Sequence, residues 1–294
     1  MQKGGRQWAA LSSVLAAVFL TGFKLLVGLM TNSLGIQAEA AHSGLDLVAA
    51  VVTLMAVNVS AKPPDTDHHY GHGKVEHLSA LFETLLLLAT CTWIIYESFQ
   101  RLFFKPVQVD ASIWAFIVMV VSIVIDYSRS GVLSTAAKKY RSQALEADAL
   151  HFRTDIWSSS VVIVGLLLVR LGAVFPNGHL IRQADSVAAL IVAGIVVYVS
   201  LRLGMSTIRG IVDHAPAGMR ERIKQSVESI PGVHECHDIR VRTSGAILFV
   251  DMHVLLDAKQ SLDEAHQLTE KIEAVVKHIA PEADVTVHAE PIQI

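Results

Sequence analysis

Long apolar stretches fill the first two thirds of the chain, and polar segments separate them. Six of these stretches approach the roughly 20 residues that a helix needs to cross the hydrocarbon core of a bilayer. They predict membrane-spanning helices near residues 9–30, 34–59, 78–104, 113–127, 147–174 and 186–203, of which the fourth is the shortest. Residues 1–6 are polar and the long first stretch lacks a small-residue cleavage site, so we expect an anchor rather than a removable signal peptide.

The pattern changes after residue 208. Helical spacing of apolar residues over 217–230 stops at Pro231 and Gly232, and residues 238–243 alternate as in a half-buried strand. A strand at 247–256, a helix at 262–279 and a strand at 284–289 follow. The order αββαβ predicts a small α+β domain of the ferredoxin or metallochaperone type over residues 209–294, beside a six-helix transmembrane domain over residues 1–208. A domain of this size is marginally stable alone, and dimerisation would help it.

Composition agrees with a membrane protein. The 294 residues are 52% hydrophobic and only 17% charged, against about 25% charged in ordinary soluble domains. This argues against a disordered chain and a simple soluble enzyme, and the net charge of −3 gives no basic field for nucleic acid. Residues 209–294 alone have a net charge of −5. Two cysteines without a CxxC pair predict neither a disulfide framework nor a thiolate zinc site, whereas fourteen histidines need a chemical explanation.

The distribution of Lys and Arg between the loops predicts the orientation. One side of the predicted bundle has eight such residues and the other has four, which are Arg101, Lys105, Arg170 and Arg182. The richer side is expected to be cytoplasmic, and an even number of spans then places both termini there, in a multi-pass protein of the cell membrane. The eight residues are Lys3, Arg6, Lys62, Lys74, Arg129, Lys138, Lys139 and Arg141.

Two HxxxD pairs lie inside predicted spans. His42 precedes Asp46 by four residues in the second span, and His151 precedes Asp155 by four in the fifth. Residues four apart share a helix face. An aspartate at the centre of a bilayer costs roughly 2.5–3.5 kcal/mol, which a bound cation would offset. Two imidazoles and two carboxylates match a tetrahedral Zn²⁺ site; the alternative is a pair of polar contacts between helices without metal.

Other ionisable residues inside the spans are weaker signals. Lys24 and Asp185 are interpreted as structural, whereas Glu83 and Asp126 are left open between ion pairs and the lining of a water-filled path.

The polar loop between the second and third predicted spans offers a second candidate metal site. Asp65, His68 and His72 are spaced as three ligands, and Gly71 and Gly73 let the backbone fold around an ion. The alternative is a solvated polar loop. Further residues in or next to the loop could substitute as ligands, namely Asp67, His69 and His77.

Together these motifs resemble the cation diffusion facilitator family. The resemblance is in HxxxD on the second and fifth spans, the KPPDxxHxYGHGKxE loop, ALxADALHFxxD before the fifth span and DHAP after the sixth, and it covers nearly the whole chain. The chain is similar to the short bacterial zinc/proton antiporter branch, which lacks a long histidine-rich loop between the fourth and fifth spans. The resemblance implies a homodimer that binds divalent metal in the bilayer and exchanges it for protons, with His at position 42 usually associated with Zn²⁺ over Cd²⁺.

The resemblance also implies roles outside the bilayer. The loop residues Asp65, His68 and His72 match a second site, and Lys74 and Asp213 match a pair that relatives use as an ion-pair interlock at the membrane–cytoplasm hinge; the alternative is two independent surface charges. A two-metal site beside a dimer interface is implied in the last domain, where relatives often have Asp at the position of Glu290. Its residues are His237, His253, His266, His288 and Glu290, whereas His234, Cys236 and His278 are interpreted as bystanders. His179, in an outer loop, is interpreted as solvated.

The predicted function is therefore efflux of a divalent cation, with Zn²⁺ as substrate and as a regulatory or structural ion, by proton antiport. The same transporter with Fe²⁺, Mn²⁺, Co²⁺ or Cd²⁺ is the alternative, because ligand types alone do not exclude these metals. A membrane histidine-box di-iron enzyme is a rival because His68, His69 and His72 resemble one box, but no further box of the HxxHH type follows. The absence of HExxH argues against a zinc protease, and the intramembrane residues argue against a metal sensor that does not transport.

Overall fold

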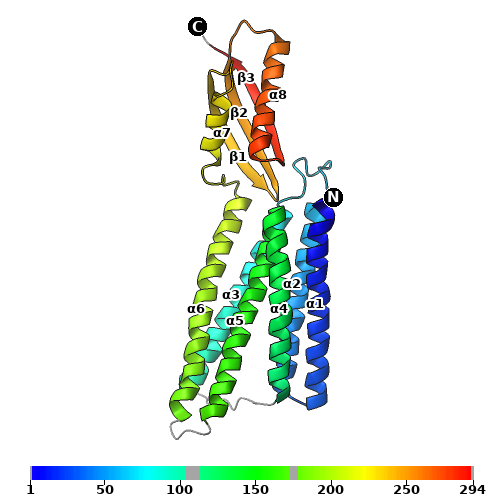
Figure 1. The fold of residues 1–294 in the computed structure, drawn as a ribbon, viewed down its shortest axis with the longest axis vertical. Coiled ribbons are helices and arrows are strands. Elements are labelled where there is room, and N and C mark those ends of the chain that lie inside the picture. The colour runs from blue at the N-terminus through cyan, green and yellow to red at the C-terminus, as the bar shows by residue number, and fades with distance from the viewer. Residues whose placement is uncertain (1, 104–112, 173–177, 293–294) are drawn as a thin grey trace. The chain divides into compact units, whose positions relative to one another are not determined.

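The computed structural model describes residues 2–103, 113–172 and 178–292, which divide into two compact units. The first unit comprises residues 1–61 and 75–207, and the second comprises residues 62–74 and 208–294. The loop between the second and third helices therefore groups with the carboxy-terminal residues. Figure 1 shows the helices of the first unit and the mixed helix and sheet structure of the second.

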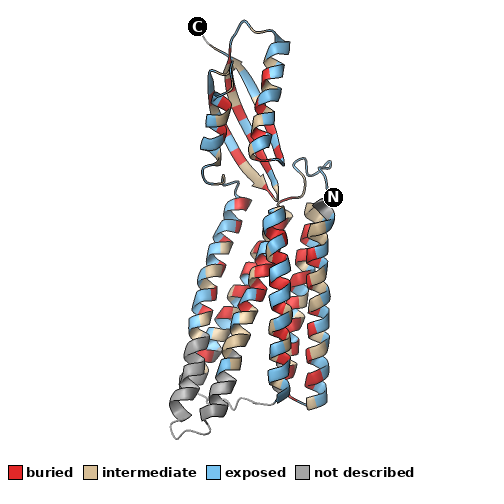
Figure 2. Cartoon of the chain, in the orientation of Figure 1, coloured by how far each residue is buried: buried red, intermediate tan, exposed pale blue. Residues whose placement is uncertain are grey.

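Six long helices make up the first unit. They are α1 (Gln2–Thr31), α2 (Leu34–Ser60), α3 (Val75–Phe103), α4 (Ile113–Tyr140), α5 (Gln143–Gly172) and α6 (Gly178–Ile211), the last of which ends in the second unit. Helix α5 packs against α2, α3 and α4, and α1 packs against α2 and α4. Buried residues lie along the facing sides of these helices, as Figure 2 shows.

Among the described residues, five helices are long and apolar enough to cross a membrane: α1, α2, α3, α4 and α6. The fifth predicted span corresponds to α5; its first half contains Glu146, Asp148, His151, Arg153 and Asp155, and the side chains of residues 165–172 lie outside the described part. The fourth span was predicted too short, since α4 continues to Tyr140. Arg129 consequently lies inside α4, buried beside Asp126, and is not a loop residue.

Several buried polar side chains in the first unit form ion pairs or hydrogen bonds within or between helices. Lys24 Nζ lies 3.2 Å from Glu39 Oε2 and donates to Ser43 Oγ at 2.8 Å. Arg129 pairs with Asp126 at 3.3 Å and also donates to Ser13 Oγ. The structural interpretation of Lys24 is confirmed, and Asp126 is an ion-pair partner. Asp185 and His179 lie among residues whose side chains are outside the described part.

The second unit has the predicted order αββαβ. It consists of α7 (Met219–Glu228), β1 (Glu235–Ser244), β2 (Ile247–Leu256), α8 (Leu262–Ile279) and β3 (Ala283–Pro291). The sheet order is β1-β2-β3, with β1 antiparallel and β3 parallel to β2. Apolar residues of both helices, such as Ile223 on α7 and Ile272 on α8, form one core with alternate residues of the strands. Since strand side chains alternate between faces, the intervening residues lie on the opposite face.

The loop of residues 62–74 packs on the strands of the same unit. The ring of Tyr70 lies edge-on to Phe249, with centroids 5.4 Å apart, and the guanidinium of Arg242 lies 4.1 Å from the Tyr70 ring centroid. Gly73 lies so close to the backbone of Ser244 that any Cβ at this position would clash. These contacts fix the loop on the sheet.

Candidate metal centres

His42, Asp46, His151 and Asp155 converge in the first unit, on α2 and α5; we call them the intramembrane quartet. His151 Nε2 lies 3.1 Å from Asp46 Oδ1 and 3.6 Å from Asp155 Oδ2. His42 Nε2 lies 4.0 Å from Asp46 Oδ1 and 3.9 Å from Asp155 Oδ1. Three of the four side chains are at least 85% buried, whereas that of His42 is 35% exposed. The sequence-predicted set is therefore brought together, with His42 at its accessible edge.

The dimensions of the quartet suit a small tetrahedral ion. A metal bound at about 2.0–2.1 Å by four ligands needs ligand atoms about 3.3 Å apart. Ligand atoms of Asp46, His151 and Asp155 lie within 4.8 Å of one another, and His151 Nε2 lies 3.1 Å from Asp46 and 3.6 Å from Asp155. A Ca²⁺ ion would require six to eight oxygen ligands at longer distances. The mixed set of two nitrogens and two carboxylates fits a transition-metal cation better.

Glu83 of α3 lies directly behind His151. Its side chain is fully buried, and its Oε1 accepts a hydrogen bond from Thr53 Oγ at 2.9 Å. Its Oε2 lies 3.7 Å from His151 Nδ1, and neither of these two buried atoms has a hydrogen-bond partner in the described part of the chain. A small movement of either side chain would join them. The sequence showed Glu83 only as an ionisable group inside a span; its pairing with His151 depends on how α3 packs against α5.

The loop triad consists of Asp65, His68 and His72, whose ligand atoms also lie within 4.8 Å of one another. Asp65 Oδ1 accepts the backbone N–H of His68 at 2.7 Å and that of Asp67 at 3.0 Å. These hydrogen bonds, first that of His68, hold the pKa of Asp65 below its ordinary value, so the carboxylate is ionised at any pH above its ordinary titration range. Gly71 has a φ of 73°, which lets the chain turn between His68 and His72.

The neighbouring candidates do not join the loop triad. The ring of His69 faces the backbone oxygen of Thr66 at 3.0 Å, and Asp67 contributes only its backbone N–H to Asp65. His77 is fully buried on α3, in the first unit.

Replacing Asp65 with asparagine should weaken Zn²⁺ binding to the loop triad by about tenfold or more, because the charged ligand is lost. The side-chain oxygen of the introduced asparagine can still accept both backbone N–H groups, so the turn should remain. Calorimetric titration with Zn²⁺ would measure this affinity. The full chain is used with Asp155→Asn as background, so that binding at the intramembrane quartet does not contribute. Asp67→Asn is the matched control and should bind Zn²⁺ with unchanged affinity. If Asp67→Asn weakened binding and Asp65→Asn did not, Asp65 would not be a ligand of the loop triad.

Three histidines meet on the sheet face opposite the core of the second unit. His237 on β1, His253 on β2 and His288 on β3 stand in direct register across the three strands. Glu290 lies two residues beyond His288; its carboxylate oxygens lie 2.8 Å from His253 Nδ1 and 3.4 Å from His237 Nε2. Two overlapping groups of candidate ligands result, His237–Asp238–His253 and His253–His288–Glu290.

Asp238 is a candidate ligand that sequence reasoning missed. It lies at the irregularity in pairing between β1 and β2, with a φ of 46°, which turns its carboxylate toward the histidines. The alternating pattern did not indicate this bulge. His266, in contrast, is not brought into either group in the described structure; it lies on α8 with its Nε2 3.6 Å from Glu270.

Cys236 precedes His237 but is buried in the core, and burial raises the pKa of its thiol to about 11. Its side chain points into the core, with Sγ 3.9 Å from Met252 Sδ, and in the described residues it joins neither ligand group. Lys74 and Asp213, the predicted interlock residues, form an ion pair of 2.9 Å within the second unit, and Lys74 also donates to the backbone oxygen of Ile211.

Comparison with known proteins gives matches along nearly the whole chain. Residues 10–212 match the family described as cation efflux transmembrane domain, and residues 215–292 match the cation efflux protein cytoplasmic domain. The cation-efflux pump FieF of Serratia proteamaculans is 30% identical over 291 residues, covering 97% of this chain and 93% of that protein. FieF of Yersinia enterocolitica is 31% identical over 288 residues, covering 96% and 92%. A solved structure of the MamM CTD in a nickel form is 24% identical, covering 26% of this chain and all of that one, with a TM-score of 0.25.

Proposed function

Because this chain belongs to the cation diffusion facilitator family, and is therefore a membrane transporter of divalent metal cations and not an enzyme, we propose that it exports Zn²⁺ in exchange for protons through the intramembrane quartet. The observation that carries this proposal is the convergence of Asp46, His151 and Asp155 within 4.8 Å of one another, with His42 3.9 Å from Asp155, on two packed helices. The di-iron enzyme and the metal sensor considered from the sequence are excluded by the family.

The preference for Zn²⁺ rests on the donor set. Tetrahedral sites with imidazole nitrogen and carboxylate oxygen ligands suit Zn²⁺, which has no geometric demand of its own. Fe²⁺, Mn²⁺, Co²⁺ and Cd²⁺ remain the alternative substrates of the same transporter. Competition among these metals in one flux assay, with the full chain in liposomes, tests the choice. Zn²⁺ should suppress the flux of each of the others; a metal that displaces Zn²⁺ at equal concentration would be the substrate instead.

Proton exchange follows from the chemistry of the ligands. A metal ion needs neutral imidazole and ionised carboxylate, so protons compete directly for the same atoms. Imidazole side chains ordinarily titrate near pH 6.5, close to cytoplasmic pH. Facing the cytoplasm, the quartet would lose protons and bind metal; facing a more acidic exterior, it would take up protons and release metal. Rocking of helices around a midplane site would give such alternating access.

We place both termini on the cytoplasmic side of the cell membrane, from the distribution of Lys and Arg, and the acidic second unit with them. The same unit is proposed to form the homodimer. The loop triad and the histidines of the sheet would bind further Zn²⁺ there, and Lys74 and Asp213 would act as the interlock. Metal bound among His237, His253, His288 and Glu290 would reduce the repulsion between two domains of net charge −5.

Replacing His237 and His253 together with alanine should abolish metal-dependent compaction of the dimer, because each of the two ligand groups then loses at least one imidazole. Small-angle scattering of the full chain in detergent, with and without Zn²⁺, would show a smaller radius with metal in the wild type only. His278→Ala, on α8, is the matched control and should compact normally. Equal compaction in the double variant would show that these histidines do not bind the responsible ion.

A further inference from the structure

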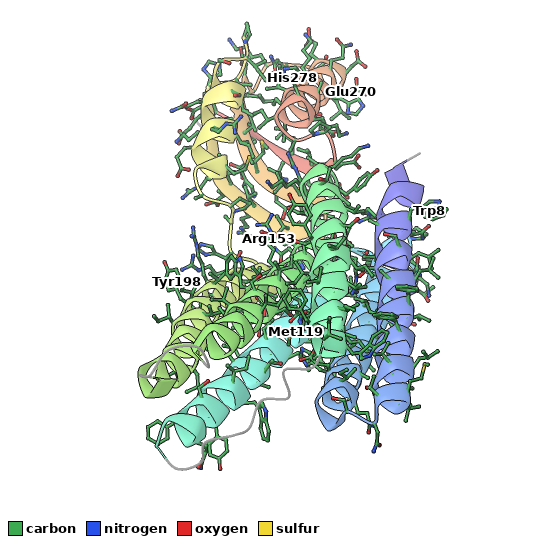
Figure 3. All side chains as sticks on the ribbon, turned by 60° about the horizontal axis from the view of Figure 1, so that its bottom comes forward. Trp8, Met119, Arg153, Tyr198, Glu270 and His278 are labelled. Atoms are coloured by element: carbon green, nitrogen blue, oxygen red, sulfur yellow. The ribbon has the colours of Figure 1, made fainter. Side chains whose placement is uncertain are left out.

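Glu39 is a carboxylate on α2 that belongs to none of the candidate metal groups of the described residues. Its side chain is 40% exposed, and its Oε2 lies 3.2 Å from Nζ of Lys24 on α1, whose own side chain is only 6% exposed. Helices α1 and α2 lie side by side, as Figures 1 and 3 show. Ionisable residues inside membrane helices commonly mark the path of an ion, and the quartet does not use Glu39.

Glu39 shares one helix face with the two quartet residues of α2. Positions 39, 42 and 46 lie within about 60° of one another around the helix axis. They lie about 8, 12 and 18 Å from the start of α2 at Leu34, so Glu39 is one turn from His42, on the side away from Asp46. Residues three apart on a helix are neighbours, and the spacing Glu-x-x-His is one that helical bundles use to bind a metal ion.

His42 is the quartet residue best placed to exchange a metal ion with Glu39. Its Nε2 lies 3.9 Å from Asp155 and 4.0 Å from Asp46, and its side chain is the most exposed of the four. In the described structure, Lys24 occupies the Glu39 carboxylate and also donates to Ser43 Oγ at 2.8 Å. Lys24 therefore keeps a hydrogen-bond partner when a metal ion displaces it from Glu39.

We propose that Glu39 and His42 form a release site for the transported Zn²⁺, one helix turn outward from the quartet. This inference rests on the proposed function and on the proposed orientation, in which the start of α2 faces the exterior. An ion that leaves the quartet keeps His42 as a ligand and gains Glu39, so it is not left inside the bilayer without a carboxylate. When the ion departs, Lys24 returns to Glu39 and keeps the empty site neutral.

The test uses the full chain in liposomes whose lumen is more acidic than the outer solution, so that uptake runs through molecules whose exterior side faces the lumen. Loss of Zn²⁺ from the outer solution is measured at increasing lumenal Zn²⁺, which should occupy the release site and inhibit the wild type. The double variant Lys24→Gln, Glu39→Gln loses the carboxylate without a change in net charge. The lumenal Zn²⁺ concentration that halves its rate should rise at least about tenfold, with an unchanged KM for Zn²⁺ on the cytoplasmic side.

Lys24→Gln alone should have the opposite effect, because it frees the Glu39 carboxylate. The half-inhibiting lumenal Zn²⁺ concentration should fall by up to about fivefold, the contribution of a partly exposed ion pair. An ion pair that only holds the helices together would be lost in both variants and would not produce opposite shifts. Gln37→Ala is the matched control, since it removes another polar contact between α2 and α1, from Gln37 Nε2 to the Gly28 oxygen, but no charge. It should be inhibited as the wild type is.

Equal half-inhibiting concentrations in the wild type and the double variant would overturn the release site. Shifts of the same direction in Lys24→Gln and the double variant, or a wild type that lumenal Zn²⁺ does not inhibit, would overturn it as well. If the double variant does not fold, Lys24→Gln decides, and anything other than a lower half-inhibiting concentration contradicts the inference. Absence of any Zn²⁺ uptake by the wild type would instead contradict the proposed function, and the release site with it.

Discussion

Asp155→Asn is expected to reduce Zn²⁺ flux in proteoliposomes by at least about 100-fold, more than the 10–100-fold typical of changes around a metal site that leave its ligands in place. Asp155 lies within 4 Å of both His42 and His151, so it is central to the quartet. Asparagine retains the shape of the side chain and one acceptor oxygen, with an NH₂ donor in place of the other. It removes the negative charge that stabilises a divalent ion inside the bilayer.

A matched variant separates this effect from general damage. Asp263→Asn removes a carboxylate at the exposed start of α8, away from every candidate ligand group in the described residues. It should transport at the wild-type rate. Thermal unfolding in detergent would establish that Asp155→Asn is folded. A folded Asp155→Asn protein with wild-type flux would remove Asp155 from the transport site.

Glu83→Ala is expected to weaken metal binding at the quartet by about 10–100-fold. A ligating imidazole binds metal through one nitrogen while the other donates to a carboxylate or carbonyl, which fixes the tautomer and the ring orientation. Here His151 Nε2 faces Asp46 and Asp155, and Nδ1 faces Glu83 Oε2 at 3.7 Å. Without Glu83, the ring loses the buried acceptor that favours a proton on Nδ1.

Glu83→Gln distinguishes a role of Glu83 in orienting the His151 ring from a role in filling space between the helices. Its amide oxygen can accept the Nδ1–H of His151 while its NH₂ group faces Thr53, so metal affinity should fall less than in Glu83→Ala. The apparent Zn²⁺ affinity, measured from flux against metal concentration, should decrease in the order wild type, Glu83→Gln, Glu83→Ala. Equal affinities of the three would mean that Glu83 does not orient His151, and equal losses in Gln and Ala would indicate a requirement for the charge instead.

Sequence periodicity predicted the elements of the second unit closely because apolar residues alternate or recur every three to four positions there; 247–256 and 262–279 match β2 and α8 in full. In the first unit, apolar content does not show where a helix ends. The polar residues between Tyr127 and Tyr140 were interpreted as a loop, yet buried Ser130, Leu133 and Ala137 continue α4 against its neighbours. Hydropathy alone cannot distinguish a solvated polar segment from a helix whose polar residues are paired.

The residues of the candidate metal sites could also be predicted only in part from the sequence. The HxxxD spacing places His and Asp on one face of each helix, and the packing of α2 on α5 then brings the pairs together. Two features required the structure. Glu83 contacts His151 only because α3 packs against α5, and Asp238 joins the histidines only because of a bulge in β1. Both depend on tertiary geometry that local spacing does not contain.

The most direct test of metal–proton exchange is a simultaneous recording of Zn²⁺ and pH inside proteoliposomes that contain the full chain. With no metal gradient at the start, an imposed pH gradient should drive Zn²⁺ to accumulate on the more acidic side, and protons should leave that side as the metal enters. Asp155→Asn should show neither change. Zn²⁺ movement that is indifferent to the pH gradient, with no accompanying proton movement in the wild type, would contradict exchange at the quartet.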